Sequence, residues 1–107
     1  MTNVLVLGAG MMGRTIAHDL SKDFYVTVVD KYAQPLATLR EFVRPDEDRN
    51  TIDTLEYDMF SDKSPEALLK RYDIVVGALP GDLGYRTAEI VLGRDATTWT
   101  YPLHQKI

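Results

Sequence analysis

Three glycines at a fixed spacing, set between an apolar run and a helical pattern, constrain the fold of this chain most. Residues 4–7 are a continuous apolar run with β-branched members, and Gly8, Gly10 and Gly13 follow directly. Such a run predicts a strand that is buried on both faces. Apolar residues then recur at positions 16, 17 and 20, which is helical spacing. The segment is therefore predicted to be a strand, a tight glycine turn and a helix.

Each glycine has a separate physical reason in such a turn. At Gly8 the missing Cβ lets the chain turn sharply off the strand. Gly10 would let the backbone lie close to a pyrophosphate, and Gly13 would let the helix pack against the strand. The start of the helix offers unpaired N–H groups and a partial positive charge to phosphates. The positions between the glycines, Ala9, Met11 and Met12, belong to the same predicted site. One of the two methionines is expected to face the ligand and the other the core.

An acid at the end of the next predicted strand makes the glycine pattern more specific. Asp30 closes the β-branched run of residues 25–30 and is 20 positions beyond Gly10. Together these features are typical of a dinucleotide-binding site, in which the carboxylate binds the adenosine ribose. A carboxylate repels a 2′-phosphate, so NAD is predicted in preference to NADP. Lys31 or Arg14 would offset that repulsion by turning toward the phosphate; the alternative for Lys31 is a solvated side chain.

Strand and helix patterns alternate along the whole sequence. Further strands are predicted at residues 51–57, 74–79 and 96–101, and further helices at 35–43, 64–72 and 87–92. This alternation predicts an α/β fold, a Rossmann-like doubly wound parallel sheet of about five strands in the order 3-2-1-4-5. Helices should cover both faces. Residues 1–107 are expected to form a single domain, with the polar segment 45–50 as a surface loop.

The ends of the later strands complete the predicted site. In open α/β sheets the ligand lies outside the carboxyl ends of the strands. Ala78, Leu79 and Pro80 are therefore expected beside the nicotinamide ribose, and Asp58 and Met59 at the edge of the adenine pocket. The alternatives are a plain strand-ending turn for the first group, and a solvated acid and a core methionine for the second.

Composition excludes several other functions. The chain has no cysteine, and its net charge of −4 gives no electrostatic reason to expect nucleic acid or an anionic membrane as a partner. No apolar run reaches the roughly 20 residues of a membrane span, and no signal peptide is evident, so a cytoplasmic protein is expected. His18 is interpreted as a surface or boundary residue, and His104 has no visible acid partner. We therefore predict no catalytic residue and no metal site.

Two segments in register carry a family resemblance. Residues 3–14 resemble the first strand and glycine loop of saccharopine dehydrogenase-like proteins, most closely lysine 6-dehydrogenase. Residues 73–84 resemble the fourth strand and the following loop of the same family. The resemblance implies an NAD(P)-binding Rossmann domain that uses Gly8, Gly10, Gly13, Asp30 and residues 78–80. Full-length relatives oxidise a C–N bond of an amino acid by hydride transfer, and a second domain makes most substrate contacts.

That substrate domain has no counterpart in these residues, so the expected activity of this chain is dinucleotide binding without turnover. Two alternatives remain open: a stand-alone NAD-sensing module that acts on a partner, and a structural domain with a vestigial glycine loop. Separation from a second domain would expose apolar surface or a strand edge. A homo-oligomer is therefore expected, formed through the last strand or around Trp99.

Overall fold

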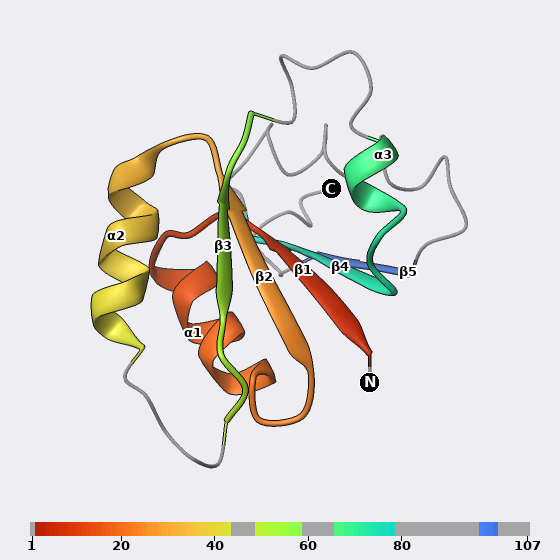
Figure 1. The fold of residues 1–107 in the computed structure, drawn as a ribbon, viewed down its shortest axis with the longest axis horizontal. Coiled ribbons are helices and arrows are strands. Elements are labelled where there is room, and N and C mark those ends of the chain that lie inside the picture. The colour runs from red at the N-terminus through yellow and green to blue at the C-terminus, as the bar shows by residue number, and fades with distance from the viewer. Residues whose placement is uncertain (1, 44–48, 59–65, 79–96, 101–107) are drawn as a thin grey trace.

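A five-stranded parallel sheet forms the centre of the molecule (Figure 1). The computed structural model describes residues 2–43, 49–58, 66–78 and 97–100. The strands lie in the order β3-β2-β1-β4-β5, as predicted. Their bounds are β1 (Asn3–Leu7), β2 (Tyr25–Asp30), β3 (Asp53–Glu56), β4 (Ile74–Gly77) and β5 (Thr97–Thr100).

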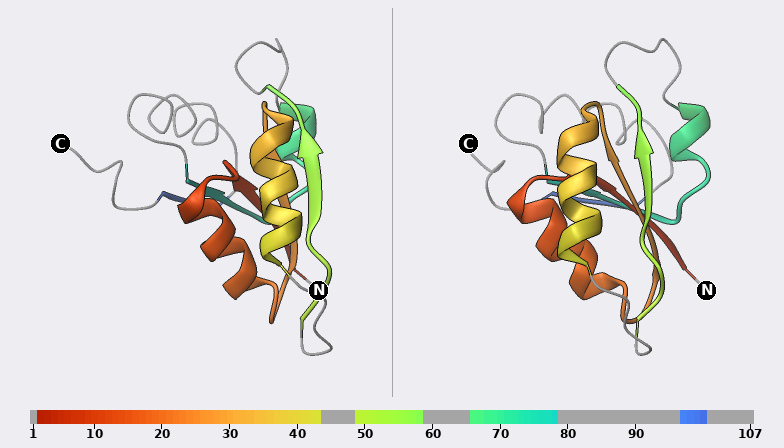
Figure 2. Two further views of the ribbon diagram at one scale, coloured as in Figure 1. Left: turned by 90° about the vertical axis from the view of Figure 1, so that its left-hand side faces the viewer. Right: turned by 60° about the vertical axis from the view of Figure 1, so that its left-hand side comes forward.

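Helices cover both faces of this sheet, which confirms the predicted α/β class. Figures 1 and 2 show α1 (Met11–Leu20) and α2 (Ala33–Phe42) side by side on one face and α3 (Glu66–Leu69) on the other. The chain adds β2 and β3 on one side of β1 and then returns to add β4 on the other side. This order places β1, the first strand, at the centre of the sheet.

The apolar run of residues 4–7 is continuous because its strand is covered on both sides. Val4 and Val6 pack on the side of α1 and α2, with Leu36 among their neighbours. Leu5 and Leu7 pack on the side of α3. Side chains alternate between the faces of a strand, so a strand between two layers of helices needs apolar residues at every position.

Several element bounds differ from those predicted. The third strand covers four residues, Asp53–Glu56, instead of 51–57, because this outer strand pairs only with β2 and its two end residues are exposed. The fourth strand ends at Gly77, two residues earlier than expected. The helix predicted at 87–92 and the expected capping residues at 64–65 lie outside the described residues.

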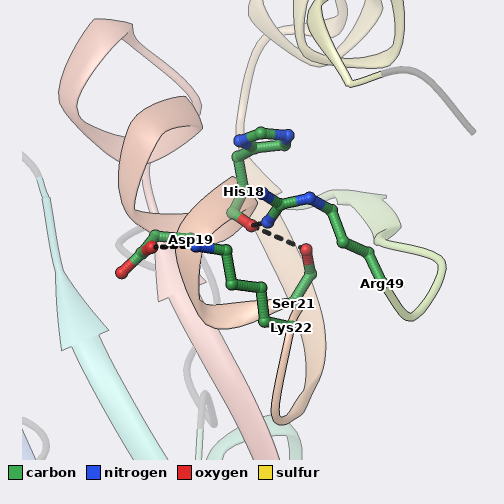
Figure 3. Close-up of polar contacts among 5 residues, drawn as sticks. All are labelled: His18, Asp19, Ser21, Lys22 and Arg49. Carbon is green, nitrogen blue, oxygen red and sulfur yellow. Dashed lines mark hydrogen bonds and ion pairs between the residues drawn. The ribbon is translucent and has the colours of Figure 1, made fainter. Parts of the chain in front are cut away.

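The end of α1 is bonded to the segment that leads into β3 (Figure 3). Ser21 is fully buried, and its hydroxyl donates a 2.7 Å hydrogen bond to the carbonyl of His18. The guanidinium of Arg49 donates to the same carbonyl, and the backbone N–H of Asn50 donates to the Ser21 carbonyl at 2.8 Å. His18 itself is half-buried, with its ring 5.6 Å from that of Phe42, as expected of a boundary histidine.

Candidate functional site

The glycine loop begins where β1 ends. Gly8 has φ 106°, in the left-handed region where an L side chain is strained, and its N–H donates to the carbonyl of Val29 at 2.8 Å. This bond ties the loop to the neighbouring strand β2. The turn expected from the sequence therefore depends on a conformation that favours glycine.

Gly10 and Gly13 face opposite environments. A Cβ on Gly13 would overlap the carbonyl of Gly8, lying 2.8 Å from its carbon atom, so α1 packs directly on the loop. A Cβ on Gly10 would meet no atom of the described residues within 4 Å, and the φ of −72° suits any residue. Packing therefore explains glycine at position 13, and nothing within the described chain requires it at position 10. Open space above Gly10 is what a ligand that contacts the backbone would need.

The start of α1 leaves backbone donors for a ligand. Gly10 is the N-cap, no side chain caps the helix, and the first turn contains no acid. The first helical bond runs from the Arg14 N–H to the Gly10 carbonyl at 2.9 Å. The N–H groups before Arg14 have no acceptor within the helix, and the helix dipole adds a partial positive charge there. Such a terminus suits phosphate.

The two methionines between the glycines differ in exposure. Met11 is 76% exposed at the first position of α1, whereas Met12 is half-buried and packs against the core beside α1 and α2. One methionine thus packs against the core, as predicted, and contact of Met11 with a ligand stays a prediction.

Asp30 joins the glycine loop to the start of α2. Its Oδ2 accepts a hydrogen bond from the N–H of Ala9 at 2.9 Å, and its Oδ1 accepts one from the N–H of Tyr32 at 3.0 Å. A carboxylate has about four acceptor positions, so further hydroxyl donors can still bind. The two bonds fix the orientation of the carboxylate beside the loop. This arrangement fits the two hydroxyls of a ribose.

The two cations named as possible phosphate contacts lie differently. Lys31 follows Asp30 directly, is exposed, and holds its Nζ 5.1 Å from the centroid of the Tyr32 ring. Arg14 lies instead over Phe42, at the last residue of α2, with 5.7 Å between the guanidinium carbon and the ring centroid. Lys31 is therefore next to the predicted ribose-binding carboxylate in the sequence, with its ammonium group over the ring of Tyr32.

Other predicted site residues are only partly described. Ala78 is buried and donates to the Leu7 carbonyl at 2.9 Å; its Cβ would lie 3.7 Å from a Cβ added to Gly13, so it adjoins the glycine loop. Asp58 is half-buried after β3, and the N–H of neighbouring Tyr57 donates to the Asp30 carbonyl at 3.0 Å. Leu79, Pro80 and Met59 lie outside the described residues.

Tyr32 is a member of this site that sequence reasoning missed. Its N–H binds Asp30, and its side chain is 60% exposed beside Lys31. The pattern that could have identified it is an aspartate whose side chain accepts from the backbone two residues later, a common arrangement after strands and in turns.

The features expected of a dinucleotide site lie together among the described residues. Three features lie together at the carboxyl ends of β1 and β2. These are the open space over Gly10, the N–H groups at the start of α1 and the fixed carboxylate of Asp30. Within the described ranges, no three His, Asp or Glu side chains gather in a way that could hold a metal ion. Nor does any described helix have the length and apolarity to cross a membrane.

Comparison with known proteins agrees with this geometry. The solved 3-hydroxyacyl-CoA dehydrogenase from Archaeoglobus fulgidus is similar in structure, with a TM-score of 0.70 and 26% sequence identity over 94% of this chain. The chain spans only 33% of the length of that protein. No curated protein sequence matches the chain. The family model described as the saccharopine dehydrogenase NADP binding domain matches residues 4–98. Since that match covers most of the sequence, the chain belongs to the family of saccharopine dehydrogenase NADP-binding domains.

Proposed function

We propose that this chain is the cofactor domain of an amino-acid oxidoreductase and binds NAD in preference to NADP. The open space over Gly10 carries the proposal, because packing within the described chain gives no reason for glycine there. Family membership supports a nicotinamide dinucleotide, although the family is described as NADP-binding. The preference for NAD rests on the carboxylate of Asp30, which would repel a 2′-phosphate.

Different residues of the site would bind different parts of the dinucleotide. The N–H groups at the start of α1 would bind the pyrophosphate, and Asp30 would accept hydrogen bonds from the adenosine ribose. Ala78 adjoins the loop on the side of β4, where the nicotinamide half would lie. The bound nicotinamide supplies hydride transfer, and the protein supplies position and electrostatics.

The substrate side of the reaction is assigned to a separate domain. The family resemblance points to oxidation of a C–N bond in an amino acid such as lysine or saccharopine. None of the described residues of this chain is proposed as catalytic. The isolated chain is therefore expected to bind dinucleotide and to turn over neither compound.

A titration with NADH and NADPH tests the proposal. Nicotinamide fluorescence or heat should report saturable binding of NADH, with weaker binding of NADPH. Gly10→Ala should lower the affinity for both by at least about tenfold while the free protein stays equally stable, because the added methyl meets no atom of the described residues. Ala37→Ser, which adds one atom at an exposed position of α2, is the matched control.

Three outcomes would contradict the proposal. Absence of binding for both cofactors at millimolar concentration would overturn the assignment as a cofactor domain. Tighter binding of NADPH than of NADH would overturn the NAD preference alone. An unchanged affinity in Gly10→Ala would place the dinucleotide away from the glycine loop.

A further inference from the structure

An open cavity lies at the opposite end of the sheet from the glycine loop. Its volume is about 380 Å³, and its walls come from the amino halves of β1 and β2, from β3 and from the turn before β4. The residues that matter here are Asn3, Thr27, Asp53, Arg71 and Tyr72. Figure 1 shows the elements that carry these residues, namely β1, β2, β3 and the connection from α3 to β4. The proposed dinucleotide site does not use it.

The pattern of strands and the short helix explains why the cavity exists. Thr27 and Asp53 are register partners in β2 and β3, so both belong to the face of the sheet that α3 covers. Leu68 and Leu69 of α3 pack on Leu5 and Leu7, toward the other end of β1. The cavity is therefore lined mainly by polar residues, with Leu55 and Tyr72 at its border with the apolar cluster.

Hydrogen bonds hold the wall opposite the sheet in place. The N–H of Asn3 donates to Oδ2 of Asp73 at 2.9 Å, and the N–H of Asp73 donates to the carbonyl of Asn3 at 2.9 Å. Tyr72 is half-buried and packs against the apolar cluster beneath α3. The turn that carries Arg71 is consequently fixed against the start of β1.

Two opposite charges line the cavity without pairing. Among the described residues, neither the guanidinium of Arg71 nor the carboxylate of Asp53 has a hydrogen bond or an ion pair, although both side chains line one space. A ligand with both an anionic and a cationic group would satisfy both of them. One arginine beside a carboxylate does not suit a polyphosphate, and the polar lining does not suit a lipid. The volume is near the lower end for small-molecule sites.

We propose that this cavity binds a small zwitterion of the α-amino-acid class. Its carboxylate would bind Arg71, whose planar guanidinium matches a carboxylate in two parallel hydrogen bonds. Its ammonium group would bind Asp53. Thr27 and Tyr72 line the same cavity, and their hydroxyls would bind the remaining polar groups. This site is separate from the proposed dinucleotide site and does not depend on it.

Amide chemical shifts of the full chain, labelled with ¹⁵N, test the proposal. Each of the 20 standard amino acids is added singly at millimolar concentration. At least one of them should shift the signals of Asn3, Thr27 and Tyr72 in a saturable manner. L-2-aminobutyrate is tested as well, because two analogues each lack one of its charged groups: butyrate lacks the ammonium group and propylamine lacks the carboxylate. Both analogues should shift these signals much less than L-2-aminobutyrate does.

Variants locate the binding. Arg71→Gln and Asp53→Asn should each lower the affinity by about tenfold or more, a loss of roughly 1.4 kcal/mol. Both side chains are exposed, so the spectrum elsewhere should show an intact fold. Lys70→Gln is the matched control, because this neighbouring cation does not line the cavity. NADH binding should be unchanged in all three variants.

Specific results would overturn the proposal. These are the absence of shifts with every amino acid, equal shifts with butyrate alone, or full affinity in Arg71→Gln. Shifts at Asp53 and Arg71 that depend on protein concentration without any ligand would show that these charges pair between copies of the chain, and would also overturn it.

Discussion

The carboxylate of Asp30 accepts a hydrogen bond from the backbone N–H of Ala9, 2.9 Å away and separated from it by 21 positions in the sequence. Its other oxygen accepts from the N–H of Tyr32 at 3.0 Å. The residue proposed to bind the ribose therefore also holds the glycine loop to the start of α2. Cofactor affinity and the stability of the empty protein should both depend on this side chain.

Asp30→Asn should reduce both quantities. Asparagine has one acceptor oxygen, and its amide nitrogen is a donor, so either Ala9 or Tyr32 loses its acceptor. We expect the free energy of unfolding to fall by about 1–3 kcal/mol, the usual cost of a part-buried donor left unpaired. Urea denaturation measures this, and cofactor titration should show weaker NADH binding with a smaller difference between NADH and NADPH.

Asp23→Asn is the control for this prediction, because the Asp23 side chain is exposed and no described residue binds it. Equal stability of Asp30→Asn and the unchanged protein would show that the two backbone bonds contribute nothing. An unchanged ratio of NADH to NADPH affinity would show that the carboxylate does not select the cofactor.

The other two glycines of the loop should behave unlike Gly10. Gly13→Ala places a methyl group on the carbonyl of Gly8 and should lower the free energy of unfolding by about 3 kcal/mol. Gly8→Ala retains the backbone only at a left-handed φ and should cost about 1–2 kcal/mol. Urea denaturation of both, with Gly10→Ala as the matched control, checks the order. A Gly13→Ala protein as stable as Gly10→Ala would contradict the close packing of α1 on the loop.

Lys31 should affect one cofactor only. Lys31 follows Asp30 in the sequence, and its ammonium group lies 5.1 Å from the ring centroid of Tyr32, whose N–H binds Asp30. We therefore expect it to meet a 2′-phosphate on the ribose. Lys31→Met should weaken NADPH binding by about fivefold, as expected from an exposed charge contact of roughly 1 kcal/mol, and should change NADH binding by less than about twofold. Lys22→Met, an exposed lysine at the other end of α1, should change neither.

Fluorescence titrations at low and high salt give both affinities. An equal loss for NADH and NADPH in Lys31→Met would place Lys31 on a part of the cofactor that the two share. No loss for either would leave it as a solvated side chain.

The sheet and its order could be predicted because their signals are local. The apolar run of residues 4–7, the glycines after it and the acid at position 30 each occupy one short segment, and the physics of buried parallel strands converts them into a fold. The bounds of β3 were predicted less well. An outer strand is defined by its pairing with β2, which residues 51–57 alone do not encode.

Contacts between distant residues account for what sequence reasoning missed. The bond from Arg49 to the His18 carbonyl joins two segments through a backbone acceptor, and every residue has such an acceptor. The cavity between Asn3 and Arg71 likewise forms only when the turn before β4 returns to the start of β1. Neither depends on a pattern within one segment. For this reason the glycine loop was predictable from the sequence and the second cavity was not.

Two adjacent residues at the end of α1 should differ in their effect on stability. Ser21 is fully buried and its hydroxyl donates to His18, whereas Lys22 forms an exposed ion pair with Asp19 at 3.3 Å (Figure 3). Ser21→Ala should lower the free energy of unfolding by about 1 kcal/mol, and Lys22→Ala by less than about 0.5 kcal/mol. Urea denaturation at low salt gives both values. A larger loss of stability in Lys22→Ala than in Ser21→Ala would contradict the greater contribution of the buried hydroxyl.

The two outer strands of the described sheet should differ in their tendency to pair with another copy. β3 has exposed acids at both ends, Asp53 and Glu56, and like charges oppose edge-to-edge pairing. The sequence of β5, Thr97–Thr100, contains no charge, and β4 is its partner on one side. We therefore expect copies of the chain to associate through β5. Light scattering should show a mass that rises with concentration, and Thr98→Lys should suppress this rise while Thr54→Lys in β3 does not. A monomer at high concentration would contradict association, and suppression by the β3 variant alone would move the interface to the other edge.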